Sequence, residues 1–213
     1  SPWKAERIFR FVRKNGLQPA SVAEIGCGVG LILDELSEKD GFQQVVFKGF
    51  DVSPQAIAIA SERSNARISF HCEDPLAADN HEHFDLLLAI DVFEHVPDYM
   101  GFVGNCRKKA AYTLYHIPLD LHVSSVLRAS FINTRASIGH LHYFTAESAI
   151  ATLKDTGHEI VDWEYTCATL DLFRLHPSFK KAVANLGRWL VSRISEAAAA
   201  RWFGGYSMLV LAR

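Results

Sequence analysis

The stretch Val22–Gly30 reads V-A-E-I-G-C-G-V-G and decides the fold. It opens with a short apolar run suited to a buried parallel strand, and it continues with glycines at Gly26, Gly28 and Gly30. From Leu31 onward, apolar residues recur with a helical period. A strand, a glycine turn and a helix form the unit in which the backbone closely approaches a ligand at a helix N-terminus. The stretch therefore predicts a ligand-binding turn, and the alternative is a tight turn without a ligand.

Downstream of this stretch, strand-length apolar runs alternate with helical patterns. We expect further strands over 45–50, 68–72, 84–90, 111–117, 159–167 and 206–212. The alternation predicts an α/β protein with a Rossmann-like, doubly wound, mostly parallel sheet and helices on both faces. At 213 residues, without internal repeats or low-complexity linkers, the chain is interpreted as a single domain, 1–213. It comprises an N-terminal helix (1–16), a core (20–167), a helical insertion (170–203) and a last strand (206–213).

Composition excludes several classes of protein. The 213 residues carry a net charge of −2 and no concentrated basic stripe, so we expect no nucleic-acid partner. The cysteines are scattered without C-x-x-C spacing, which favours a reduced, cytoplasmic setting. No apolar run approaches the ~20 residues that span a bilayer. No signal peptide is visible, although the chain begins at Ser1 without methionine and residues upstream remain an open alternative. The basic N-terminal helix is expected to pack on the domain rather than to bind a membrane.

Acidic side chains follow three of the expected strands, at the edge where a doubly wound sheet binds its ligand. Asp51 ends the second strand, Asp74 follows the third, and D-V-F-E-H-V-P-D from Asp91 follows the fourth. A glycine turn followed by an acid at the end of the next strand is typical of a ribose-binding site. The G-x-G-x-G spacing has Leu31 where a dinucleotide fingerprint has glycine, and no G-K-[ST] is present, so the ligand is expected to lack a pyrophosphate.

Three motifs, E-I-G-C-G-V-G, G-F-D-V-S-P and F-D-L-L-L-A-I-D-V-F-E-H-V-P-D, resemble the leading motifs of class I S-adenosylmethionine-dependent methyltransferases. The closest resemblance is to the ubiquinone/menaquinone-methyltransferase-like (type 11/type 12) small-molecule group. The later stretches G-H-L-H-Y-F-T-A-E-S and T-G-H-E-I-V-D-W extend it over roughly residues 20–165. The resemblance implies S-adenosylmethionine as methyl donor, S-adenosylhomocysteine as product, and an antiparallel last strand.

The resemblance also implies which residues bind the cofactor. Gly26, Cys27, Gly28 and Gly30 would lie beside its methionyl part, Glu24 at its amino group, Asp51 at the ribose hydroxyls, Val52 and Asp74 at the adenine, and Ile90, Asp91 and His95 near the transferable methyl. Two alternatives stay open: Asp74 is equally well interpreted as a turn former, and Glu94 as part of a solvated helix start.

Histidines are the candidate catalytic residues, because a hydroxyl acceptor often needs a base near neutral pH. We predict His95 and His140 for this role. The candidate substrate-binding residues are His122, Arg128, Arg135, His140 and Tyr143. The pairs His81-x-His83 and His140-x-His142 have no third ligand at a familiar spacing, so no metal is expected.

The sequence thus predicts methyl transfer to an O, N or C nucleophile of a small-molecule or lipid-like acceptor. One alternative is a non-catalytic cofactor-binding sensor or scaffold, and a less favoured one is a nicotinamide-dependent oxidoreductase. The departure from the family pattern is the insertion over 170–203, whose apolar positions include Leu186, Leu190 and Ile194. It is interpreted as a substrate lid, a dimer surface or, less favoured, a membrane-interface helix. The protein is expected to be a monomer or a homodimer.

Overall fold

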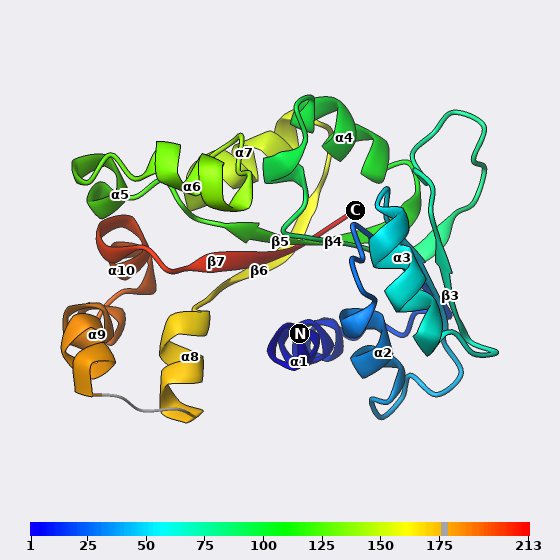
Figure 1. Cartoon of the computed structure of the whole chain (residues 1–213), viewed down its shortest axis with the longest axis horizontal. Helices are drawn as coiled ribbons and strands as arrows, with labels where there is room; N and C mark the ends of the chain where they lie inside the picture. Colours follow the sequence, from blue (N-terminus) through cyan, green and yellow to red (C-terminus); the bar gives the residue numbers. More distant parts are fainter. Residues whose placement is uncertain (176–178) are drawn as a thin grey trace.

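A seven-stranded sheet forms the centre of the protein (Figure 1). The computed structural model describes residues 1–175 and 179–213. The strand order is β3-β2-β1-β4-β5-β7-β6, and β7 runs antiparallel to both of its neighbours while the other pairs are parallel. This confirms the predicted α/β class with an antiparallel last strand. The strands are β1 (Ser21–Ile25), β2 (Val46–Phe50), β3 (Ile68–His71), β4 (Phe84–Ile90), β5 (Ala110–Pro118), β6 (Ile160–Thr166) and β7 (Ser207–Ala212).

Helices cover both faces of this sheet, as the alternating apolar pattern requires. Side chains of β4 show why, because Leu86 and Leu88 pack in the core with α1 and α2, while Leu87 and Ala89 pack in the core with α4 and α7. Figure 1 shows these helix pairs on opposite sides of the strands. The helices are α1 (Pro2–Lys14), α2 (Leu31–Ser37), α3 (Pro54–Ala60), α4 (Tyr99–Cys106), α5 (Val123–Leu127), α6 (Phe131–Ile138), α7 (Ala146–Asp155), α8 (Ala168–Leu175), α9 (Phe179–Ser192) and α10 (Glu196–Phe203).

In the described residues, the insertion between β6 and β7 forms the helices α8, α9 and α10. Ser195 caps α10, because its hydroxyl accepts the backbone N–H of Ala198 at 3.2 Å. The expected apolar face is exposed to solvent at Leu186 and Leu190, and Ile194 is 90% exposed. In the described part of the chain, no helix is long and apolar enough to cross a membrane.

Helix α1 packs on the domain through Ile8, Phe11 and Val12, which are buried. Its basic side chains pair with acids of the same chain: Lys4 with Asp91, Arg7 with Asp171, and Lys14 with Asp162 and Glu164. The contacts agree with the expectation that this helix packs on the domain, and they bring α1 to the end of β4 and to α8.

The glycine turn after β1 holds three left-handed residues, with φ of +70° at Gly26, +54° at Gly28 and +78° at Gly30. They serve different purposes. A Cβ on Gly26 would lie 2.7 Å from Cγ2 of Val92, and one on Gly30 would lie 2.5 Å from Cζ of Phe70. A Cβ on Gly28 would meet no atom within 4 Å. Two of the glycines therefore permit internal packing, and only Gly28 faces open space.

We predict that Gly30→Ala destabilises the protein by about 2–3 kcal/mol, because it combines left-handed strain with a collision against the Phe70 ring. The matched control is Gly16→Ala, whose φ is +67° but whose Cβ would have nothing within 4 Å. That variant should lose only about 1 kcal/mol. Urea unfolding measures both free energies, and equal losses would show that the ring does not constrain Gly30.

Candidate active site

Asp51 joins the glycine turn to the start of α3. Its Oδ2 accepts the backbone N–H of Gly28 at 2.9 Å, and its Oδ1 accepts that of Ser53 at 2.8 Å. Next to it, the Val52 side chain is 78% exposed and offers an apolar surface. The carboxylate is fixed beside the open space at Gly28, and its remaining lone pairs are available to hydroxyl donors.

Glu24 lies in β1 directly before the glycine turn and is fully buried, and its Oε2 has no hydrogen-bond partner. Burial raises the pKa of this carboxyl to about 8, although the positive charges of the chain's first residue and of Lys4 oppose the shift. A buried carboxyl with an unpaired oxygen is suited to receive a cationic group. Burial likewise raises the pKa of Cys27 to about 12, so this residue is a neutral thiol.

Asp91 follows β4 in a left-handed conformation, with φ of +55°. The Nδ1 of His116 donates to its Oδ1 at 2.5 Å, and the ammonium of Lys4 pairs with its Oδ2. Burial opposes ionisation of Asp91, but His116 and Lys4 outweigh it and lower the pKa to about 2. The Nε2 of His116 also lies 3.0 Å from the hydroxyl of Thr166. Asp91 is therefore a charged carboxylate whose two oxygens are already bonded to Lys4 and His116.

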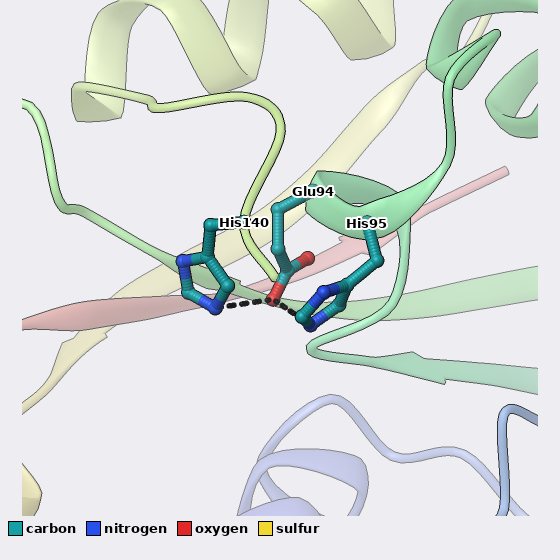
Figure 2. A group of neighbouring side chains, drawn as sticks. All are labelled: Glu94, His95 and His140. Carbon is teal, nitrogen blue, oxygen red and sulfur yellow. Dashed lines mark ion pairs between the residues drawn. The ribbon is translucent and has the colours of Figure 1, made fainter. Parts of the chain in front are cut away.

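Three residues from two distant segments meet beyond Asp91: Glu94, His95 and His140 (Figure 2). Glu94 is fully buried on the short 3-10 turn Phe93–His95, and neither of its carboxyl oxygens has a hydrogen-bond partner. Its Oε1 lies 4.0 Å from Nε2 of His95 and 4.0 Å from Nε2 of His140. Burial, together with the charge of Asp91, raises the pKa of Glu94 to about 8. We call these three residues the Glu94 cluster.

The second ring nitrogen of each histidine is already bonded. Nδ1 of His140 donates to Oδ2 of Asp120 at 2.6 Å, and Nδ1 of His95 donates to the carbonyl of Gly139 at 3.1 Å. The backbone N–H of Leu141 donates to the carbonyl of Glu94 at 2.8 Å. These bonds hold the loop that carries His140 against the turn after β4, and they leave both Nε2 atoms facing the Glu94 carboxyl.

The other sequence-predicted residues lie elsewhere. His122 caps α5, because its Nδ1 accepts the backbone N–H of Ser125 at 3.1 Å. Arg128 and Arg135 are exposed, and the Tyr143 hydroxyl donates to the carbonyls of Phe131 and His140. The candidate substrate residues thus have structural or surface positions here, apart from His140.

Two further expectations concern neighbouring acids. Asp74 is exposed, and its Oδ1 accepts the backbone N–H of Leu76 at 2.9 Å, so the turn-forming interpretation has direct support, while its contact with adenine stays a prediction. The expected solvated helix start at Glu94 is wrong, because the chain forms a buried 3-10 turn there.

Sequence reasoning missed Asp120, His116 and Lys4. A signal existed for Asp120, which comes two residues after β5 and lies at the same sheet edge as the acids already identified. His116 lies inside a strand and Lys4 in a distant helix, so neither carried a local signal.

A family model described as a methyltransferase domain matches residues 3–162. The chain belongs to this methyltransferase family. Together with the strand order, the match confirms the resemblance to class I methyltransferases. A curated relative, a ubiquinone biosynthesis O-methyltransferase from Bradyrhizobium sp. (strain ORS 278), is 36% identical over 95 residues, which are 43% of this chain and 36% of that protein. The chain thus matches only about a third of this relative's length.

Solved methyltransferase structures share the fold. The N-methyltransferase NodS from Bradyrhizobium japonicum WM9, in complex with S-adenosylhomocysteine, has a TM-score of 0.61 at 17% identity, covering 99% of this chain and 85% of that one. The magnesium protoporphyrin IX methyltransferase ChlM from Synechocystis PCC 6803, with bound S-adenosylhomocysteine, has a TM-score of 0.65 at 13% identity, covering 100% and 83%.

The residues of this chain fit S-adenosylmethionine. Gly28 faces open space, Asp51 has lone pairs for ribose hydroxyls, and the unpaired Glu24 oxygen suits an ammonium group. Ile90 ends β4 and Asp91 follows it, both beside the glycine turn, since β4 pairs directly with β1. The individual contacts with the cofactor stay predictions.

We predict that Glu24→Gln stabilises the ligand-free protein at pH 8 by about 1–3 kcal/mol, because it removes a buried charge. The folded-state pKa is raised, so the wild type is most stable below the ordinary pKa of the group and loses stability as the pH rises toward 8. The gap between variant and wild type should therefore close as the pH falls to about 4.5. Urea unfolding at several pH values measures it.

Glu24→Gln should also bind S-adenosylhomocysteine at least tenfold more weakly at pH 8, because the variant lacks a carboxylate to bind the amino group of the cofactor. The matched control is Glu38→Gln at an exposed position, which should change neither quantity. Unchanged affinity in Glu24→Gln, measured by calorimetry, would refute the assigned role of Glu24.

Proposed function

We propose that this methyltransferase transfers a methyl group from S-adenosylmethionine to an oxygen nucleophile of a small-molecule acceptor. The observation that carries the proposal is the Glu94 cluster, which lies three residues beyond Asp91 at the carboxyl end of β4. In a doubly wound sheet this edge is where ligands bind. The proposed acceptor therefore meets the Glu94 cluster where the transferable methyl is expected.

The chemistry of the Glu94 cluster favours oxygen over nitrogen. A hydroxyl must lose its proton to become a strong nucleophile, whereas a neutral amine already has its lone pair. Glu94, His95 and His140 direct one carboxyl and two imidazole nitrogens toward one point, and Asp120 orients His140. Such a set activates a hydroxyl by receiving or displacing its proton. The name of the curated O-methyltransferase relative supports the same choice.

In the proposed reaction S-adenosylmethionine supplies a methyl group already activated on a sulfonium, so the protein's task is mainly positioning. Glu24 and Asp51 hold the donor, with Asp91 fixed beside it by His116 and Lys4. The acceptor oxygen loses its proton at the Glu94 cluster and forms the new bond to carbon as the carbon–sulfur bond breaks. The bonding electrons remain on the sulfur.

An apolar hollow beside α5 supports an acceptor with a hydrophobic part. It measures about 380 Å³ and is lined mainly by Leu121, Val126 and Leu127. His122 and Arg201 are polar residues in its lining. Leu121 directly follows Asp120, so the hollow adjoins the segment that orients His140. Its size is in the range of pockets that bind small molecules. A lipid-like acceptor accordingly stays within the proposal.

Other expectations remain predictions from the sequence. These are the cytoplasmic location, the monomer or homodimer and the absence of a nucleic-acid partner. The competing non-catalytic sensor would bind the cofactor in the same way and transfer nothing. A screen with methyl-labelled cofactor and pools of phenols, alcohols and amines separates these functions, and the sensor predicts no labelled product.

We predict that Asp51→Asn weakens binding of S-adenosylhomocysteine at least tenfold, because the amide replaces one acceptor oxygen with a donor and loses the charge. Asp79→Asn, at an exposed loop position, is the matched control and should bind normally. Calorimetric titration measures both. Tighter binding of NAD than of S-adenosylhomocysteine by the wild type would refute the proposed cofactor.

We predict that Glu94→Gln impairs methyl transfer but leaves cofactor binding nearly unchanged. It should lower the rate of transfer to a hydroxyl acceptor at least 100-fold, the loss expected when an activating group is removed. Its affinity for S-adenosylhomocysteine should stay within about threefold of wild type, since Glu94 lies beyond the donor residues. A full loss of cofactor binding in this variant, with an unchanged circular dichroism spectrum, would place Glu94 in the donor site instead.

A further inference from the structure

The Glu94 carboxyl lacks the partners that a buried acid requires. Both of its oxygens are buried and without a hydrogen bond, and the nearest imidazole nitrogens lie at 4.0 Å, which is beyond hydrogen-bond distance. Buried polar groups without partners are rare in folded proteins and often mark an ion or a ligand. The Glu94 carboxyl and the two rings point toward one another (Figure 2), so that a single atom bound between them would contact all three side chains.

The donor set identifies the kind of atom. One carboxylate oxygen and two imidazole nitrogens form the three-residue set typical of divalent first-row transition ions at catalytic sites, where further coordination positions stay open. An all-oxygen set would favour calcium or magnesium instead. The two nitrogens therefore point to an ion such as Zn²⁺, Mn²⁺ or Co²⁺.

The bonds at the far side of each ring are an independent indication. A histidine that binds a metal usually donates its other N–H to a carboxylate or a backbone carbonyl, which fixes the tautomer. His140 donates to Asp120 and His95 donates to the carbonyl of Gly139, both through Nδ1. Each Nε2 is consequently left with its lone pair directed at the Glu94 cluster.

We propose that Glu94, His95 and His140 bind a divalent first-row transition ion. The three ligand atoms lie within 4.8 Å of one another, whereas ligand atoms on a tetrahedral ion at ~2.1 Å are separated by ~3.4 Å. The set must therefore contract slightly on binding. The His95 side chain is 38% exposed and has the freedom to move, while Glu94 and His140 are held in place by burial.

Neighbouring acids do not compete for this ion. Asp91 is paired with Lys4 and His116, and Asp120 is bonded to His140. The spacing also explains why the site is absent from local sequence patterns, because His140 comes 45 positions after His95.

The role of the ion in catalysis rests on the proposed function, whereas binding of the ion by the Glu94 cluster does not. The ion's open position would hold the acceptor's hydroxyl and lower its pKa, so that the proton leaves to water. The oxygen then forms its bond to the methyl carbon, and the carbon–sulfur bond breaks with its electrons retained by sulfur. One proton, one methylated acceptor and one S-adenosylhomocysteine result, and no oxidant or reductant is required.

The test measures metal binding without the cofactor or the acceptor. Tag-free, full-length protein is depleted of metal with a chelator, and Co²⁺, Mn²⁺ and Zn²⁺ are titrated separately by calorimetry, with Co²⁺ also followed by its visible absorption. We expect one ion per chain, and at least tenfold weaker binding in Glu94→Gln and in His140→Gln. His81→Gln, at an exposed position outside the Glu94 cluster, is the matched control and should bind like wild type. Mn²⁺ avoids interference from the exposed Cys72 thiol, because thiolates prefer softer ions.

A thermal melt gives a second readout. Saturating Mn²⁺ should raise the melting temperature of wild type and of His81→Gln, but not that of Glu94→Gln. Wild-type protein that binds none of the three ions, or Glu94 and His140 variants that bind them as tightly as wild type, would overturn the site. If the site is overturned but methyl transfer persists in the presence of a chelator, the proposed function stands. If the metal binds but no acceptor is methylated, the metal site stands and the proposed function fails.

Discussion

Four carboxylates meet at the carboxyl ends of β1, β2 and β4, and only Asp91 is hydrogen-bonded to a basic side chain in the described part of the chain. Asp51 is satisfied by backbone N–H groups, while Glu24 keeps one unpaired buried oxygen and Glu94 keeps two. Burying a carboxylate without a partner is costly, and the raised pKa of Glu24 and of Glu94 expresses that cost. The rest of the site is arranged around these two unpaired acids.

The contrast between the paired Asp91 and the unpaired Glu24 and Glu94 explains how a stable fold and a binding site coexist. Asp91 is paired with Lys4 and hydrogen-bonded to His116, and these contacts tie α1 and β5 to the end of β4. The other two buried acids are left for groups that the chain does not supply: an ammonium at Glu24 and, in our proposal, a divalent ion at Glu94. Binding then stabilises the folded state by satisfying groups that destabilise it when ligand-free.

Much of the fold could be predicted from the sequence, because β4 is apolar on both faces and the glycine turn has strong local signals. The acids after the strands followed from the rule that ligands bind at strand ends, and the roles of the other cofactor-side residues were implied by the family resemblance. The Glu94 cluster could not be found in this way. Glu94 was interpreted as solvated because its burial depends on the loop that carries His140, and the ring of His140 is oriented by Asp120 from another strand end. His122 was predicted to bind the substrate, yet its ring nitrogen caps α5.

The two sides of the site are physically joined through α1. Lys4 reaches Asp91 beside the proposed donor, while Trp3 and Arg7 of the same helix bind Asp171 in α8. Asp171 belongs to the insertion whose last helix, α10, borders the apolar hollow near Asp120. The insertion is therefore not an independent appendage, because its first helix is anchored to the donor side and its last helix to the acceptor side. Such a connection favours a role in shaping the acceptor pocket over a role as a separate interaction surface.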